Sequence, residues 1–340
     1  MAYTELHAHS AYSFLDGASQ PEELAARAAE LGYEALALTD HDGVYGSLEF
    51  AYAAKHFGVR PITGAEVTLA GGAHVTLLVE TPAGYTNLCR LLTAAHAHTR
   101  DSTGREPSPP ALEQELLEEL NDGLVCLSGC ARDGLAVHYP NAAARLAAAF
   151  GRDRFFVELQ RPYERGDARR NAALRDLAES LHMHTVVTGD VHAHDIRRAS
   201  LQDVLVAVRC RTSLDGCERE RRGNHECVLA APADMLERFP DDRAAVERTS
   251  ELAERLEFDL TQELGYRYPD FSDGVDPAIV QLTHICNDVF AERYGSDRVA
   301  RARLDDELAL IDELGLAGFF LLHWEVLELA REVALEVRGP

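Results

Sequence analysis

Lysine is almost absent from this chain of 340 residues, in which Lys55 is the single example. The 33 basic residues are outnumbered by 57 acidic ones, which gives a formal net charge of −24. A protein that binds nucleic acid unaided usually presents a basic face. The composition therefore excludes strong electrostatic binding of nucleic acid by this chain alone, and most of any such binding would come from other parts.

Long apolar runs and paired cysteines are missing as well. The most apolar stretch, residues 314–324, is far shorter than the ~20 residues of a transmembrane helix. The chain starts Met-Ala-Tyr-Thr-Glu-Leu-His, without the basic and apolar segments of a secretory signal peptide. The seven cysteines include no Cys-x-x-Cys pair, which favours reduced thiols. We therefore expect a cytoplasmic protein that does not contact a membrane.

The composition, with 46% hydrophobic and 26% charged residues, is that of a globular protein. Apolar strands alternate with helices, which predicts an α/β fold with a mostly parallel sheet covered by helices. Ser19 and Glu22 have the spacing of a capping box before the first helix. Helices are expected at residues 22–31, 47–57, 85–96, 112–120, 168–181 and 201–208. Strands are expected at residues 3–6, 34–39, 59–69, 74–80, 123–127, 155–159 and 185–188, and seven strands favour a barrel over a short open sheet.

The second part of the chain has a different pattern. Residues 212–226 are polar and charged and are expected to form a surface loop. Pro, Asp, Gly and Ser accumulate at residues 269–277, which indicates a domain boundary. We therefore divide the chain into a domain at residues 1–270 and a further region at 271–340. The later helices are expected at 245–256, 280–294, 299–314 and, as an amphipathic segment, 322–337.

His7 and His9 form a His-x-His motif at the end of the first expected strand. Residues i and i+2 of a strand point to the same face, so the two imidazoles are presented together at a spacing that suits one metal ion. Alone, the motif is more typical of ordinary surface or hydrogen-bonded histidines than of a metal site. The second His-x-His, His96 and His98, lies at a helix end, where i and i+2 face different directions, and is expected not to bind metal.

Metal-ligand residue types recur where expected strands end. The active sites of β/α barrels lie at the C-terminal ends of their strands, and random placement would not repeat this pattern, so a metal site is predicted. Asp40 is expected either to orient a ligand imidazole or to cap the following helix. The candidate ligands are His7, His9, Asp16, His41, Glu66, His74, Cys130, Asp190 and His192.

Four motifs contain most of these residues: Glu5-Leu-His-Ala-His-Ser10, Tyr12-Ser-Phe-Leu-Asp-Gly17, Ala37-Leu-Thr-Asp-His-Asp42 and Val191-His-Ala-His-Asp195. They resemble the polymerase-and-histidinol-phosphatase (PHP) family of metal-dependent phosphoesterases. Within it, the chain is similar over essentially its whole length to the N-terminal domain of bacterial DNA polymerase III alpha subunits of the error-prone type. The resemblance implies a distorted seven-stranded (β/α) barrel, followed here by a mainly helical C-terminal segment.

The resemblance also implies a site for three divalent transition metals. His7, His9, Glu66 and Asp190 would hold one ion, and Glu66 would bridge to a second ion held with His74 and Cys130. Asp16, His41 and His192 would hold the third.

The ligand types indicate the metal and the chemistry. Imidazole, carboxylate and thiolate suit Zn, Mn or Fe better than Mg or Ca, and the Cys130 thiolate favours Zn. Such ions neutralise a phosphodiester and lower the pKa of bound water. The resemblance implies metal-dependent phosphodiester hydrolysis of the 3′–5′ exonuclease type, with Glu66, Asp190 and His192 as catalytic residues.

Residues 306–322 resemble the start of the alpha-subunit palm. The chain ends before the catalytic aspartates of that region, so no polymerase activity is expected from this chain alone. The implied partners are a single-stranded 3′ end of DNA, bound weakly, and the remainder of the polymerase. A sliding clamp and mutasome accessory proteins are further candidates.

Two other functions stay open. The same ligands would serve a non-catalytic, metal-stabilised scaffold that supports the polymerase core. They would also serve a stand-alone phosphomonoesterase of the histidinol-phosphatase type, although the palm-like residues 306–324 argue against it.

Overall fold

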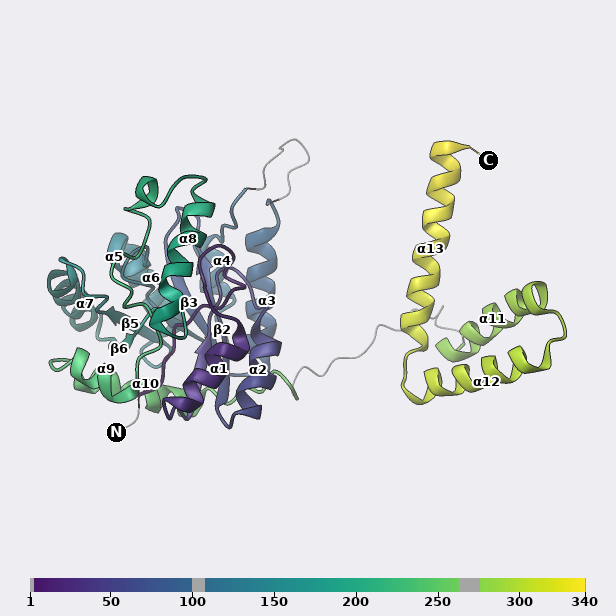
Figure 1. Ribbon diagram of the computed structural model, residues 1–340, viewed down its shortest axis with the longest axis horizontal. Helices are drawn as coiled ribbons and strands as arrows, with labels where there is room; N and C mark the ends of the chain where they lie inside the picture. The colour runs from purple at the N-terminus through teal and green to yellow at the C-terminus, as the bar shows by residue number, and fades with distance from the viewer. Residues whose placement is uncertain (1–2, 100–107, 263–275, 340) are drawn as a thin grey trace. The chain divides into compact units, whose positions relative to one another are not determined.

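The computed structural model describes residues 3–99, 108–262 and 276–339 (Figure 1). The chain divides into two compact units, residues 1–264 and residues 265–340, called here the barrel unit and the helical unit. The predicted boundary at residues 269–277 lies mostly outside the described residues.

The barrel unit is built on a curled six-stranded sheet whose spatial order follows the sequence, β1-β2-β3-β4-β5-β6. The pairs β1–β2, β4–β5 and β5–β6 are parallel, whereas β3 is antiparallel to both neighbours. The mixed α/β barrel-like class is confirmed, with one reversed strand. The strands are β1 (Ala35–Leu38), β2 (Arg60–Thr68), β3 (His74–Val79), β4 (Leu124–Leu127), β5 (Phe155–Gln160) and β6 (His184–Thr188).

The N-terminal segment, residues 3–9, takes the place of the seventh strand. It forms isolated parallel bridges to β1 on one side and to the chain after β6 on the other. Ala37 N donates to Glu5 O at 2.9 Å, and Val191 N donates to His7 O at 3.0 Å. The segment predicted as a continuous strand at residues 3–6 is therefore a pair of bridges that connects the two edges of the sheet.

The inner face of the sheet changes character along its strands. Leu6, Ile62, Leu78, Phe156 and Val186 belong to one buried apolar cluster. Because side chains on one face of a strand recur every second residue, the positions that follow on the same face of β2 and β5 are Glu66 and Glu158. The alternation thus fills one end of the barrel with apolar side chains and the other end with polar ones.

Helices cover the outside of the sheet (Figure 1). Leu252, Ala253 and Leu256, at the end of α10, belong to the inner apolar cluster. Most helices lie where the sequence predicts them, but α5, α6 and α9 are not among the predicted helices. The helices of the barrel unit are α1 (Pro21–Glu30), α2 (Ser47–His56), α3 (Pro82–His96), α4 (Gln114–Glu119), α5 (Leu135–His138), α6 (Pro140–Phe150), α7 (Asp167–Leu181), α8 (Ala199–Arg209), α9 (Pro232–Arg238) and α10 (Arg243–Arg255).

The capping box predicted at the start of α1 is wrong by one residue. The helix begins at Pro21, and Gln20 N donates to Glu23 Oε2 at 2.9 Å. Ser19 instead accepts from His194 N at 2.8 Å. Ser19 and Glu22 have the spacing of a capping box, but the Ser19 hydroxyl accepts a hydrogen bond from the distant His194 and does not cap the helix.

The helical unit consists of α11 (Ala278–Tyr294), α12 (Arg298–Glu313) and α13 (Ala317–Arg338). Its small core joins the three helices through Leu282, Leu308, Ala317 and Leu321. Across the described ranges 3–99, 108–262 and 276–339, each helix is too short or too polar to cross a lipid bilayer.

Candidate metal centre

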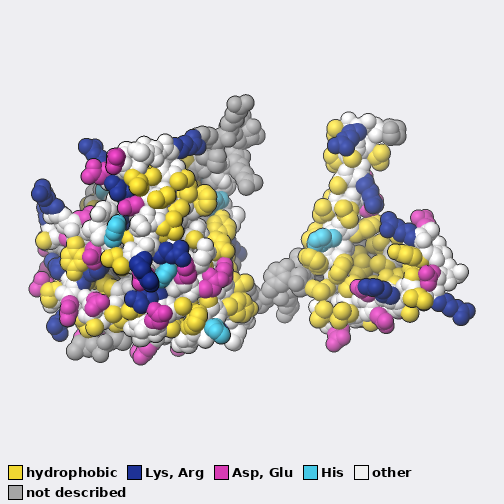
Figure 2. Space-filling model, viewed as in Figure 1, with side chains coloured by type: hydrophobic (Ala, Val, Ile, Leu, Met, Phe, Trp, Pro, Cys, Tyr) yellow, Lys and Arg dark blue, Asp and Glu magenta, His cyan; other side chains and the backbone are white. Residues whose placement is uncertain are grey.

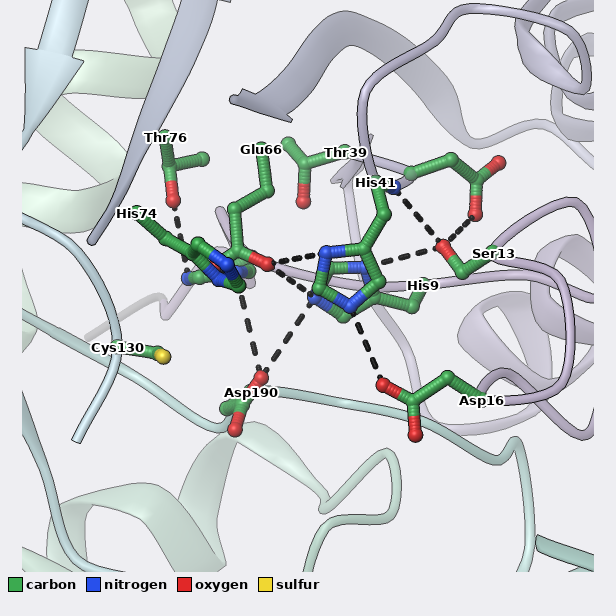
Figure 3. A network of polar contacts seen from close by, with 12 residues as sticks. His9, Ser13, Asp16, Thr39, His41, Glu66, His74, Thr76, Cys130 and Asp190 are labelled. Atoms are coloured by element: carbon green, nitrogen blue, oxygen red, sulfur yellow. Dashed lines mark hydrogen bonds and ion pairs between the residues drawn. The ribbon is translucent and has the colours of Figure 1, made fainter. Parts of the chain in front are cut away.

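Side chains from several strand ends converge at the polar end of the barrel (Figure 3). Glu66 lies near the end of β2, and His74 is the first residue of the antiparallel β3. His9 comes from the N-terminal segment, and Asp190 follows β6. The reversal of β3 is what places the start of that strand beside the ends of the others.

Glu66 lies at the centre of the cluster. Its Oε1 atom is 3.5 Å from His7 Nε2 and 3.4 Å from His74 Nδ1. Its Oε2 atom is 3.7 Å from His9 Nε2 and 2.7 Å from His41 Nδ1. The carboxylate thus faces four imidazoles, which is the arrangement expected of a bridging ligand; its proximity to His41 goes beyond the ligand sets implied by the resemblance.

Asp190 and Asp16 flank this centre on either side of His192. Asp190 Oδ1 lies 3.6 Å from His9 Nε2 and 4.0 Å from His7 Nε2. Asp16 Oδ2 lies 3.2 Å from His41 Nε2 and 3.3 Å from His192 Nε2. The two aspartates therefore extend the cluster in two directions from Glu66.

Cys130 is buried and lines the same cavity as Glu66 and His74. Its Sγ atom accepts from Asp133 N at 3.3 Å. Burial, together with the negative charges of Glu66 and Asp190, raises the thiol pKa well above its usual range. Without a cation this side chain is therefore a neutral thiol, and a nearby metal would be needed to make it a thiolate.

The buried ligand atoms fit a metal. His7 Nε2, His9 Nε2, Glu66 Oε1 and His74 Nδ1 are buried without a hydrogen-bond partner in the described structure. Buried polar atoms are normally paired, and the three nitrogens lie 3.4 to 3.7 Å from the Glu66 carboxylate oxygens. Three sets of ligand atoms lie within 4.8 Å of each other: His7, His9 and Glu66; His9, His41 and His192; and His41, Glu66 and His74.

The charges in the cluster are strongly coupled. Burial would raise the pKa of Glu66, but His74 and His41 hold it well below the usual range. Burial would lower the pKa of His41, but Glu66 and Asp16 raise it to about 10. In the absence of metal, a proton on His41 thus balances part of the carboxylate charge, and a bound cation would displace that proton.

The imidazoles are oriented by a second layer of polar groups. His7 Nδ1 lies 2.7 Å from Glu158 Oε1, which also accepts from Gln160 Nε2 at 2.8 Å and from Thr188 Oγ1. A histidine whose Nδ1 donates to a carboxylate presents the lone pair of Nε2. Glu158 was not predicted from the sequence, although a carboxylate within the apolar stretch 155–159 was a usable signal.

Asp40 acts through a serine. Ser13 Oγ donates to Asp40 Oδ1 at 2.7 Å and lies 3.2 Å from His9 Nδ1. Asp40 also accepts from Ser10 N and Ser10 Oγ at 2.6 and 2.7 Å. Of the two roles expected for Asp40, its contacts are those of a group that orients a candidate ligand.

Arg222 enters the site from the segment that was predicted to be a surface loop, so that prediction is wrong at this residue. Its Nη1 donates to Asp190 Oδ2 at 2.5 Å, and its Nη2 lies 2.5 Å from His192 Nε2 and 3.8 Å from Asp16 Oδ2. His192 Nδ1 lies 2.9 Å from Asp190 O, which leaves Nε2 to accept from the guanidinium. The polar composition of residues 212–226 did not indicate that the Arg222 side chain would point into the site.

The centre opens into a cavity of about 460 Å³. Glu66, His41 and His74 lie on its wall together with the exposed ring of Phe14 and the side chain of Arg209. Arg209 Nη1 lies 3.4 Å from Asp16 Oδ1. A ligand in this cavity would therefore meet the candidate metal ligands, cationic groups and an aromatic ring.

Two further histidines, His96, which was predicted not to bind metal, and His194, lie outside these contacts. His96 is the last residue of α3, and its Nε2 atom lies 2.7 Å from Asp42 O. His194 Nδ1 is 2.7 Å from Ser19 Oγ. Each has a hydrogen-bonding role of its own, and neither belongs to the three sets of clustered ligand atoms.

The sequence of the chain is similar to those of known proteins. Residues 5–162 match the PHP domain family. The whole chain is 40% identical to a protein named Error-prone DNA polymerase from Symbiobacterium thermophilum, of which it covers 33%. It is 37% identical over 99% of its length to a protein of the same name from Cutibacterium acnes, covering 31% of that protein. The Pseudomonas aeruginosa protein of this name is 36% identical over 97% of the chain, of which 31% is covered.

Among solved structures, a protein from Bifidobacterium adolescentis to which metal-dependent phosphoesterase activity is ascribed has a TM-score of 0.42 and 15% identity, covering 56% of this chain and 87% of that one. The chain spans about a third of the length of the curated relatives described above. Residues 5–162 therefore match the PHP domain family, within a chain that is similar along its whole length to part of proteins named Error-prone DNA polymerase.

Proposed function

We propose that the barrel unit is a metal-dependent phosphodiesterase of the 3′–5′ exonuclease type, within a DNA polymerase III alpha subunit of the error-prone type. The observation that carries the proposal is the convergence of unpaired, buried ligand atoms of His7, His9, Glu66 and His74 beside an open cavity. A purely structural site has no need of an open side, whereas a hydrolase must admit its substrate.

Three divalent transition ions, Zn in the first place and Mn or Fe as alternatives, would occupy the ligand sets implied by the resemblance. They would neutralise the phosphodiester and lower the pKa of a bound water. Glu66 would be shared by two of the ion sets, Asp190 would help to hold the first ion and His192 the third. Because Arg222 donates to His192 Nε2, an ion at Asp16, His41 and His192 competes with this guanidinium and is expected to bind most weakly.

The partners follow from the relatives. Proteins named Error-prone DNA polymerase imply DNA as the substrate and the remainder of the polymerase as the neighbour, in the cytoplasm. With a net charge of −24, this chain would hold a single-stranded 3′ end weakly and rely on the remaining two thirds for affinity. A sliding clamp and accessory proteins complete the proposed assembly, and polymerisation itself is assigned to residues beyond this chain.

The decisive experiment compares three substrates on the metal-loaded chain: a single strand with a free 3′ end, a circular single strand and a small phosphomonoester. Hydrolysis of the linear strand from its 3′ end, lost in Glu66→Gln, is the expected result. Asp16→Asn affects only the most weakly held ion and is expected to retain more activity than Glu66→Gln. Release of phosphate from the monoester alone would assign the site to the phosphomonoesterase class instead.

One contact favours a second function, a metal-stabilised scaffold. Arg222 forms an ion pair with Asp190 and also contacts His192, and such pairing stabilises a fold without any reaction. In that case metal would raise the melting temperature while all three substrates stay intact. Hydrolysis that is lost in Glu66→Gln rules this out.

A further inference from the structure

Among the described residues of the barrel unit, Phe14 has the most exposed aromatic side chain, with 81% of its surface accessible. It lies within the Tyr12–Gly17 motif, between Ser13 and the candidate ligand Asp16. The ring lines the cavity that also contains Glu66 and His41. A phenyl ring in this position contributes little to the core, so its exposure at the mouth of the site calls for another role.

The backbone around Phe14 is held in place on both sides. Ser13 N donates to Ser10 O at 2.9 Å, and Asp16 N and Gly17 N donate to Ser13 O at 3.0 and 2.9 Å. The Ser13 hydroxyl is fixed by its hydrogen bond to Asp40. The exposed ring therefore stands on a well-anchored turn, which limits the conformational entropy lost when a ligand binds to it.

Two arginines line the same cavity as this ring. Arg209 is the last residue of α8, its side chain is 42% exposed, and it reaches within 3.4 Å of Asp16. Arg132 lies on the same cavity wall and donates to Glu220 O at 2.7 Å. An aromatic platform beside arginines is the combination with which proteins bind single-stranded nucleic acid, because bases stack and the backbone is anionic.

We propose that Phe14 stacks on the terminal base of a single-stranded end, while Arg209 contacts the backbone phosphate that precedes it. This inference rests on the proposed phosphodiesterase function and specifies its substrate as a strand with a base at its end. Stacking reads no sequence, because every base has a π face. The site would therefore act on any unpaired end, whereas a base held in a duplex is stacked on its neighbour and unavailable to Phe14.

The test uses the full chain and a short oligonucleotide that carries 2-aminopurine at its 3′ end. Metal is removed with chelator so that the strand stays intact during the titration. Stacking on an aromatic ring quenches 2-aminopurine fluorescence, so the titration yields both affinity and a direct signature of stacking. The matched control is Phe57→Ala, since Phe57 is exposed at the end of α2 and is not among the residues lining this cavity.

Phe14→Ala is expected to weaken binding about fivefold or more and to abolish the quenching, whereas Phe14→Tyr and Phe57→Ala retain both. An oligonucleotide with an abasic 3′ end is expected to bind wild type and Phe14→Ala equally. Equal quenching by wild type and Phe14→Ala, no binding by wild type, or an equal loss on the abasic strand overturns the inference. Hydrolysis of a linear strand by the wild type, measured separately, keeps the proposed function even if Phe14 has no role; absence of hydrolysis removes the function itself.

Discussion

The barrel unit and the helical unit bury their apolar side chains to very different extents. In the barrel unit, two large clusters line both faces of the sheet. In the helical unit, one small cluster of four buried residues joins α11, α12 and α13. Figure 2 shows hydrophobic side chains exposed over this unit, and Trp324, Leu327 and Leu329 of α13 are between 43% and 58% exposed.

The two units differ in how much buried apolar area stabilises them. Burial of apolar area contributes roughly 25 cal/mol per Å², and the barrel unit has enough of it to keep charged groups inside. Most apolar side chains of α13 lie outside the small core of the helical unit, so this unit buries little apolar area. A functional site of buried charges is therefore compatible with the first unit and not with the second.

The largest expected effect is that of Glu66→Ala. Because Glu66 faces four imidazoles, its loss should remove most of the bound metal and lower hydrolysis by roughly 10³-fold or more. Elemental analysis and the linear-strand assay measure the two effects. Glu34→Ala, an exposed glutamate of the same unit, serves as the control. Full metal content in Glu66→Ala would show that this carboxylate is not the centre of the site.

Metal removal should destabilise the barrel unit, and the effect should grow with pH. In the metal-free protein the raised pKa of His41, about 10, stabilises the fold fully below about pH 6.5, the unfolded value, and this is lost as pH rises toward 10. Metal binding requires a neutral imidazole and strengthens over the same range. The difference in melting temperature between metal-loaded and chelated protein should therefore widen from pH 6.5 to 9. A constant or shrinking difference would contradict a histidine-rich metal site.

A substitution in the core of the helical unit should lower the unfolding free energy of that unit alone. Leu321→Ala removes a side chain that is 4% exposed, and the lost packing should cost about 2–3 kcal/mol of unfolding free energy. Trp324 is the single tryptophan of the chain, so urea unfolding followed by its fluorescence reports this unit. Val337→Ala, at a side chain 78% exposed, should change the free energy by less than about 0.5 kcal/mol. Equal effects of the two substitutions would mean that the small cluster does not hold the helices together.

The smallest effect is expected from ending the chain at residue 264. All candidate ligands lie at or before His192, and the buried clusters of the barrel unit include no residue beyond Leu260. Metal content and melting temperature should stay close to those of the full chain, and light scattering should show a monomer. Loss of metal or unfolding of the shortened chain would show that the helical unit is part of the barrel core.

The sequence determined the features that depend on local order. Continuous apolar segments between helices located six strands to within a few residues, and ligand-type residues at strand ends predicted a cluster of side chains. These signals are local because a strand's faces and ends follow from its own residues. The first segment was predicted as a strand for the same reason, although its pairing is limited to isolated bridges.

Only the tertiary structure decided which distant side chains support the site. His7 and Glu158 are 151 residues apart, and Arg222 reaches Asp190 from a segment without periodicity. Ser19 shows the converse, since its contact with His194, 175 residues away, replaced the predicted cap. Closure of the barrel creates these contacts, and a through-space contact between segments leaves no spacing in the sequence. The residue types at the strand ends were therefore determined by the sequence, whereas their orientation, their charge balance and the opening of the cavity beside Phe14 came from the fold.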